Sequence, residues 1–252
     1  MSEFLTGVAI CLCLTTAALL CLWLHPRLPE THREERTHGV VKIAVGMIVV
    51  MTSLVLGLLI SSVKTIYDGV DSNVHAFSTQ LILLDRALKL YGPETIETRR
   101  LLSDYVERAL DGTWPQNGEP AKVEDQNAGR LLDETEQSLK RIEPTTPQQR
   151  ELWSAALQRL QRIVELRWTL IEQSGGTVST PILVMLVAWL TLIFASFGYN
   201  APRNAIVVIT LILCTTSVAA AVFLIIEMDK PFTGAIKVSP EPIQRALAFM
   251  RR

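Results

Sequence analysis

One stretch decides the fold: residues 40–90, which read VVKIAVGMIVVMTSLVLGLLISSVKTIYDGVDSNVHAFSTQLILLDRALKL. Its first half, from Val41 to Ile60, is apolar apart from Lys42 and a few small or weakly polar residues. Its second half carries apolar residues three or four positions apart, the repeat of one face of a helix. These residues are Ile66, Val70, Val74, Phe77, Leu81, Leu84 and Leu88.

The stretch contains no proline, and the next one, Pro93, follows Tyr91 and Gly92. A glycine followed by a proline is typical of a helix end. The sequence therefore predicts one continuous helix of roughly 75 Å, at 1.5 Å per residue. About 30 Å of this helix would cross the hydrocarbon core of a bilayer, and the remainder would project into water.

Three other segments are long and apolar enough to cross a membrane: Phe4 to Leu24, Thr177 to Phe197 and Ala205 to Ile226. The first lies where a signal peptide would lie. However, Met1-Ser2-Glu3 lacks the positive charge that opens a signal peptide, and the apolar run is too long for one. We therefore expect four retained transmembrane helices.

The polar segment between the second and third spans predicts helices and no strands. Amphipathic patterns cover about Glu94–Leu110 and Val123–Ile142, and Thr146-Pro147-Gln148-Gln149 is typical of a capping box that opens a helix reaching Gln173. The expected fold is an all-α membrane protein with an extramembrane helical bundle inserted between the second and third of four transmembrane helices. The expected division is 1–63, 64–173, 174–227 and a C-terminal tail, 228–252.

Four spans place both termini and the helical insert on one side of the membrane. The balance of basic residues near the span ends favours a cytoplasmic insert. On the insert side these are Lys64, Arg162, Arg167, Lys230, Lys237 and Arg245, and on the other side Arg27, Arg33, Arg36, Lys42 and Arg203.

Composition excludes several classes of protein. Of 252 residues 49 % are hydrophobic and the net charge is −1, which indicates apolar spans with a polar insert and no nucleic-acid partner. The four cysteines all fall in apolar spans, and we interpret them as small buried hydrophobic residues. Neither they nor the first three histidines have the spacing of metal ligands, so we expect no metal and no cofactor. These residues are Cys11, Cys13, Cys21, Cys214, His25, His32 and His38.

No nucleotide-binding, hydrolase or metalloprotease motif is present, and we expect the protein not to be an enzyme. No Asp, Glu, Lys or Arg lies near the middle of any span. Charged residues at that depth mark proton relays and ion-coupled carriers. The sequence therefore disfavours a pump and fits a passive pore or a membrane scaffold.

Small residues recur on one side of the second span at Gly46, Ser53, Gly57 and Ser61. They allow a neighbouring helix to approach closely, and they would equally leave room for a water-filled path. We favour close packing over pore lining.

Charged residues follow the second and fourth spans at the membrane boundary: Lys64, Asp68, Glu227, Asp229 and Lys230. One interpretation is a charged vestibule that concentrates or filters ions outside a pore. The other, which we favour, is an interfacial ion pair, for instance Lys64 with Asp229, that fixes how two helices meet.

Several strings resemble a bacterial membrane family described as bestrophin-like, and they occur in the same order along nearly the whole chain. They are Gly57–Lys64 (GLLISSVK), Leu83–Leu88 (LLDRAL), Tyr91–Glu94 (YGPE), Glu227–Gly234 (EMDKPFTG) and Val238–Pro240 (VSP). The resemblance implies a pentameric anion channel of the bacterial inner membrane. It also implies four spans per subunit, the second span around the pore and helices below the membrane.

Two features depart from bestrophins. The second span has no aromatic residue, so Ile43, Met47, Val50, Leu54 and Leu58 would supply an aliphatic pore neck. Glu227 and Asp229 alone provide too few oxygens for a tight calcium site.

The first functional hypothesis is a homo-oligomeric channel for small anions, lined by the second span. Its constriction residues would be Met47, Val50, Leu54 and Leu58, which would gate the pore by wetting and drying. The alternative is a non-conducting membrane scaffold whose helical insert docks a partner protein.

Overall fold

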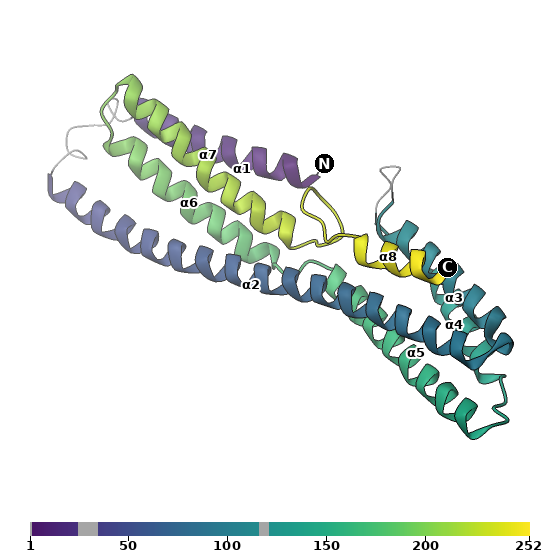
Figure 1. Cartoon of the computed structure of the whole chain (residues 1–252). Helices are drawn as coiled ribbons and strands as arrows, with labels where there is room; N and C mark the ends of the chain where they lie inside the picture. Colours follow the sequence, from purple (N-terminus) through teal and green to yellow (C-terminus); the bar gives the residue numbers. More distant parts are fainter. Residues whose placement is uncertain (1, 25–34, 116–120) are drawn as a thin grey trace. The chain divides into compact units, whose positions relative to one another are not determined.

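The computed structural model describes residues 2–24, 35–115 and 121–252 (Figure 1). These residues form helices and no strands, as the sequence predicts. The elements are α1 (Ser2–Leu24), α2 (Glu35–Tyr91), η3 (Pro93–Thr95), α3 (Ile96–Thr113), α4 (Gln126–Lys140), α5 (Pro147–Ser174), α6 (Thr180–Asn200), α7 (Ala205–Met228) and α8 (Glu241–Met250). Four of them, α1, α2, α6 and α7, are long and apolar enough to cross a membrane, so the protein is a multi-pass membrane protein.

The predicted continuous helix is confirmed as α2, whose 57 residues run without a break through positions 61–68. It ends where the sequence indicates. Gly92 has a φ of 134°, a backbone conformation that favours glycine, and Pro93 follows. The Thr95 hydroxyl donates hydrogen bonds to the carbonyl oxygens of Leu88 at 2.6 Å and Gly92 at 2.9 Å, which satisfies carbonyls left open at the helix end.

The chain divides into two compact units, which we call the membrane unit (residues 1–65 and 177–229) and the helical unit (66–176 and 230–252). In the membrane unit, α1 packs closely against α6 and α7 (Figure 1). A Cβ atom at Gly198 of α6 would lie 1.9 Å from the Ala18 carbonyl oxygen of α1. Such a close approach of two backbones is possible only because residue 198 has no side chain.

Polar contacts add to the packing of these spans. Thr15 of α1 and Thr215 of α7 share a hydrogen bond at 2.9 Å. Arg203, in the turn before α7, donates to the carbonyl oxygens of Leu22 at 3.2 Å and Trp23 at 2.6 Å. These two carbonyls belong to the last turn of α1, where no partner within the helix exists, so Arg203 fixes the end of that span.

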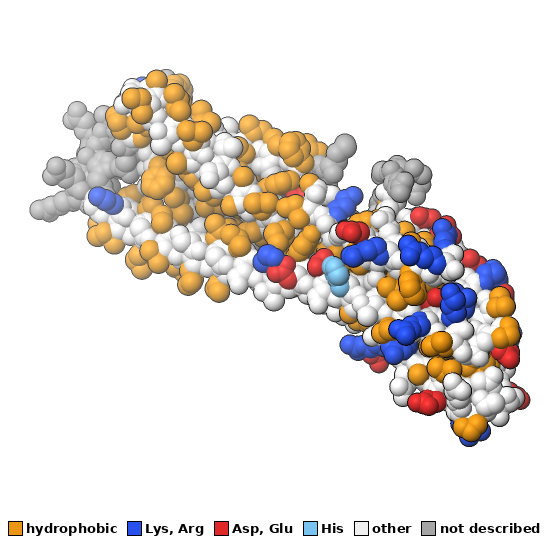
Figure 2. Space-filling view, viewed as in Figure 1, with side chains coloured by type: hydrophobic (Ala, Val, Ile, Leu, Met, Phe, Trp, Pro, Cys, Tyr) orange, Lys and Arg blue, Asp and Glu red, His pale blue; other side chains and the backbone are white. Residues whose placement is uncertain are grey.

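The core of the helical unit is built around the predicted stripe of α2. Six of its seven residues, from Val70 to Leu88, are buried, and Ile66 is half-buried. They pack with residues of α3, α4 and α5 such as Leu102, Leu139 and Leu160. Charged side chains lie over this unit, whereas hydrophobic side chains dominate the surface of the spans (Figure 2).

Helix ends in the helical unit follow local rules. The capping box at Thr146 is present: Gln149 N donates to the Thr146 hydroxyl at 3.1 Å, and Thr146 N donates to the Gln149 side chain at 3.3 Å. Helix α4 is shorter than its pattern indicates, because the Asp125 carboxylate accepts from Asn127 N and sets the start at Gln126.

The C-terminal segment is folded into the helical unit, although its sequence indicates only a short tail. Phe232 and Val238 are buried, and α8 contributes Ile243, Ala246 and Leu247 to the core. Ser78 of α2 donates to the Pro242 carbonyl at 2.6 Å, and the Trp114 indole donates to the Val238 carbonyl at 2.8 Å.

Candidate functional site

The membrane half of α2 presents a continuous apolar surface that no other described part of the chain covers. We call Ile43, Met47, Val50, Leu54 and Leu58 the outer face of α2; these side chains are 63–69 % exposed. On the opposite side, Thr52 and Val63 are buried, and Val55, Leu56 and Leu59 contact the core of the membrane unit.

The contrast with the other spans is large. Only 6 % of the most apolar window of α2 is buried, against 22 % in α1 and α7 and 28 % in α6. The proposed constriction residues Met47, Val50, Leu54 and Leu58 therefore share one face and make no core contact in the described chain. Leaving such side chains in water would cost about 1.5–3 kcal/mol each, so lipid or another protein chain must cover them.

The small residues Gly46, Ser53, Gly57 and Ser61 are also exposed, beside the outer face. No heavy atom lies within 4 Å of the position a Cβ would take at Gly46 or Gly57. Neither glycine therefore makes a close helix contact with the residues that the structure describes.

Close contacts of small residues occur instead at two glycines that the sequence analysis did not single out. They are Gly198 against Ala18, and Gly7, where a Cβ would lie 3.0 Å from the Phe223 ring. Both glycines lie inside apolar spans, and this position is the sequence signal that could have indicated a close contact between helices.

A groove of about 650 Å³ lies between α2 and α6 in the membrane unit. Gly46 and Val49 line it from α2, and Phe197 lines it from α6. Among the described lining residues, Lys42 is the one that carries a charge. The groove continues the uncovered surface of α2 and offers space for an apolar chain from outside the molecule.

Two lysines bracket the apolar run of α2. Lys42 and Lys64 are 22 positions apart, about 33 Å at 1.5 Å per residue, which matches the thickness of the hydrocarbon core. By helical geometry both lie on the side of α2 that carries the small residues. Both are exposed, and Lys64 has an interaction partner in the chain.

Among the boundary charges, Asp229 has a clear local role. Its Oδ1 accepts hydrogen bonds from Thr177 N at 2.8 Å, the Thr177 hydroxyl at 3.0 Å and Val178 N at 3.0 Å. The carboxylate thereby joins the end of α7 to the segment that leads into α6. Asp68 and Lys230 are exposed, Glu227 is buried, and all three have interaction partners.

The sequence strings within the helical unit have structural explanations. Asp85 is 2 % exposed and receives two hydrogen bonds from Arg99, Nε–Oδ1 at 2.7 Å and Nη2–Oδ2 at 3.3 Å. Arg99 also donates to the Met250 carbonyl at the end of α8, at 3.4 Å. Burial raises the pKa of Tyr91, and the Glu94 carboxylate raises it further, so the Tyr91 hydroxyl stays protonated.

The cysteine interpretation needs correction. Cys13 and Cys214 are exposed and Cys11 and Cys21 half-buried, because each span buries only a narrow strip of its surface. The residues that the structure describes contain no group of three His, Cys, Asp or Glu side chains able to hold a metal ion. His25 and His32 lie outside the described residues.

Comparison with protein families gives one result that covers most of the chain. The family model described as Bestrophin-like domain matches residues 12–243. The chain has no match among curated proteins and none among solved structures.

Proposed function

The chain belongs to the bestrophin-like family, and we propose that several copies of it form an ion channel whose pore is lined by α2. The observation that carries this proposal is the outer face of α2. In the described chain α1, α6 and α7 cover one another, while α2 leaves its largest apolar surface without a protein partner.

The composition of this surface favours another protein chain over lipid as its cover. Helix contacts within membranes are enriched in small residues, and the outer face is flanked by Gly46, Ser53, Gly57 and Ser61. When copies of α2 surround an axis, the small residues allow neighbouring helices to approach, and the large residues point inward. The ring order is five by analogy with bestrophins.

The pore neck in this arrangement is aliphatic. Met47, Val50, Leu54 and Leu58 form a constriction that conducts when it is wet and closes when it dries. Lys42 and Lys64 sit at the two ends of the apolar run, and rings of lysine raise the local concentration of anions. We therefore expect the permeating species to be small inorganic anions. We propose no enzymatic role for the protein.

The proposed setting is the bacterial inner membrane, with the termini and the helical unit in the cytoplasm. Four spans put residues 66–176 on the same side as both termini, and the basic residues at the span ends favour the cytoplasmic side.

Chloride flux from liposomes that contain the purified full-length protein tests the proposal. We expect flux down a chloride gradient and a ring of defined subunit number in detergent. Replacing Met47, Val50 or Leu54 with alanine should raise conductance, because a wider neck dries less readily. The matched control is Leu213→Ala on α7, a residue 65 % exposed but not on α2, which should leave conductance unchanged.

A scaffold is the rival, and the exposed Leu90 and Ile96 of the helical unit support it, since two large apolar side chains there are about two-thirds uncovered. Absence of flux under every ion gradient, from protein that still forms a ring, would exclude the channel and favour the scaffold.

A further inference from the structure

The groove between α2 and α6 in the membrane unit is mostly apolar and is formed by one face of each helix. Its wall on α2 consists of residues that recur at the spacing of a single helix face: Gly39, Lys42, Val45, Gly46 and Val49. Ser196 and Phe197 form its wall on α6. Its volume of about 650 Å³ falls within the range of roughly 300–1,000 Å³ that is typical of small-molecule sites.

Two glycines make the α2 wall hollow. No heavy atom lies within 4 Å of the position that a Cβ would take at Gly39 or Gly46. A larger side chain at either position would therefore extend into the groove. The space along this wall is open to an occupant from outside the described chain.

Lys42 gives one end of the groove a positive charge. It is exposed and stands at the start of the apolar run of α2, the level at which lipid headgroups meet a transmembrane helix. In the membrane unit, the carboxylates whose side chains the structure describes are Glu227 and Asp229. Both lie at the end of α7, across the membrane from the start of α2. No described carboxylate of this unit therefore balances the charge of Lys42.

We propose that the groove binds one anionic glycerophospholipid, with an acyl chain along the α2 wall and the phosphate group beside Lys42. Lipid tails are as apolar as the spans themselves, so the tail alone gives no preference for the groove over the bilayer. The preference comes from the headgroup, because basic pockets between transmembrane helices attract anionic headgroups. The inference goes beyond the proposed function and does not require conduction.

A second copy of the chain is the other candidate for the groove. Copies related by rotation about the membrane normal hold equivalent residues at the same depth, so an α2 seated in the groove would bring its own Lys42 to this level. Like charges at close range oppose that contact, whereas a lipid phosphate complements the charge. The outer-face residues of α2 do not line the groove, so a lipid here leaves that face available to other copies.

Fluorescence quenching by brominated lipids tests the site. Phe197→Trp places a reporter in the groove, and because Phe197 is 47 % exposed the larger ring has room. The full-length protein is reconstituted in phosphatidylcholine liposomes that contain increasing fractions of brominated phosphatidylglycerol or brominated phosphatidylcholine. The difference from protein without the reporter gives the quenching at the groove. We expect the reporter to prefer phosphatidylglycerol roughly fivefold, the effect of one basic residue on an anionic lipid.

Charge variants of the reporter protein show whether Lys42 causes the preference. Lys42→Gln should remove it, and Lys42→Glu should reverse it. The matched control is Lys64→Gln, which removes the lysine at the other end of the apolar run and should leave the preference unchanged. A second reporter, Ile209→Trp, replaces a residue of α7 that is 57 % exposed and does not line the groove. Its quenching should not depend on Lys42.

The proposal fails if the two brominated lipids quench the Phe197→Trp reporter equally. It also fails if Lys64→Gln lowers the preference as much as Lys42→Gln, since the attraction would then belong to the surface in general. Quenching of Ile209→Trp without quenching of Phe197→Trp would show that protein, and not lipid, fills the groove, and would overturn it too. Chloride flux is measured separately, so failure of this site and failure of the proposed channel are distinguishable.

Discussion

The two halves of α2 have the same secondary structure and opposite surroundings. In the helical unit its apolar residues form a narrow stripe, and Val70, Leu81 and Leu84 are fully buried in the core. In the membrane unit the helix is apolar on all sides, and Met47, Val50 and Leu54 are about two-thirds exposed. The half of α2 in the helical unit is buried by its own chain, whereas the half in the membrane unit must be covered by lipid or by another protein chain.

The comparison separates two uses of apolar residues. In water an apolar stripe predicts its own burial, since the hydrophobic effect pulls it from solvent. In a bilayer lipid is as apolar as leucine, so composition does not say which face of a span meets protein. Small residues and shape decide that contact, which is why Gly198 is enclosed and Gly57 is open.

The largest expected effect is at the closest backbone approach. Gly198→Leu places a side chain where even a Cβ lies 1.9 Å from the Ala18 carbonyl, so α1 and α6 must separate. We expect little folded protein, measured as the monodisperse fraction in detergent by size-exclusion chromatography. Gly57→Leu is the matched variant in open space: the subunit should still fold and elute as a monodisperse species, even if its assembly with other copies weakens. An equal loss of folded protein in both variants would contradict the contrast between the two glycines.

The next effect compares leucines of the two halves of α2. Leu81→Ala should lower the free energy of unfolding by about 2–5 kcal/mol, because Leu81 is fully buried and alanine leaves a cavity. Leu54→Ala should cost the isolated subunit far less, because Leu54 is 64 % exposed, but it should change conductance. Denaturant unfolding and liposome flux on both variants measure the two quantities. A large loss of subunit stability from Leu54→Ala, without change in flux, would overturn the role of the outer face.

A smaller effect is expected at Asp229. Asp229→Ala removes an acceptor of three hydrogen bonds at the start of the segment leading into α6, comparable to loss of a helix cap, about 1–2 kcal/mol. Thermal unfolding in detergent measures the loss. Asp229→Asn keeps an oxygen acceptor and should lose less. If both variants retain full stability while anion flux changes, Asp229 acts as a vestibule charge instead.

The smallest effect is confined to alkaline pH. Burial raises the pKa of Tyr105 above its ordinary 10.0, so the folded state holds this proton more tightly than the unfolded state. The resulting stabilisation is fully present below pH 10 and declines as pH rises above it, by at most about 1.4 kcal/mol per pH unit. The difference in unfolding free energy between the unmodified protein and Tyr105→Phe should therefore be constant below pH 10 and shrink above it. A difference that stays flat into the alkaline range would show that Tyr105 is not deeply buried.

Much of the fold could be predicted from local sequence. The helix over residues 40–90, its end at Gly92-Pro93 and the capping box at Thr146 depend on nearest neighbours along the chain, and all are confirmed. The predicted stripe of α2 also forms the core of the helical unit, because its repeat of three and four residues defines one face.

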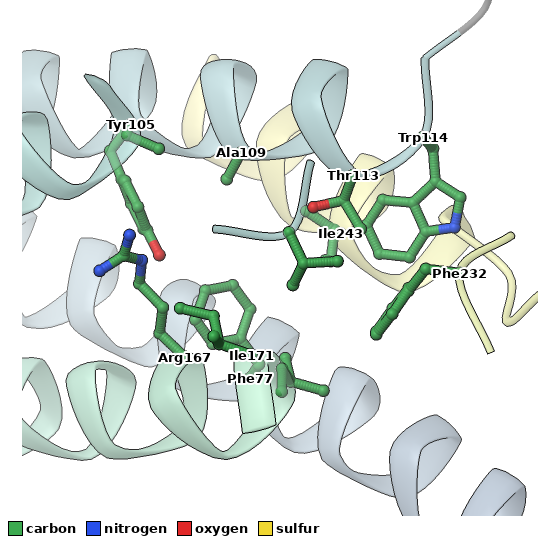
Figure 3. Close-up of a pocket in the computed structure, with 12 residues that line it drawn as sticks. Phe77, Tyr105, Ala109, Thr113, Trp114, Arg167, Ile171, Phe232 and Ile243 are labelled. Carbon is green, nitrogen blue, oxygen red and sulfur yellow. The ribbon is translucent and has the colours of Figure 1, made fainter. Parts of the chain in front are cut away.

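The missed features depend on contacts between distant residues. The C-terminal segment has a helix of ten residues, too short to be stable alone, and it folds because Phe232, Ile243 and Ala246 reach the core of the helical unit. Tyr105 and Arg167 line one small pocket of the helical unit (Figure 3) although they are 62 positions apart in sequence, and only the tertiary packing of that unit brings them together.

The amino-acid sequence alone determined which segments are helical, which of them cross a membrane and that one helix serves both regions, because hydrophobicity, capping and proline placement act over a few residues. Only the tertiary structure decided which side of α2 is covered, which glycine permits two helices to touch and which buried tyrosine lines a pocket with Arg167. Those outcomes depend on the shapes of side chains brought together from distant parts of the chain, which no local pattern encodes.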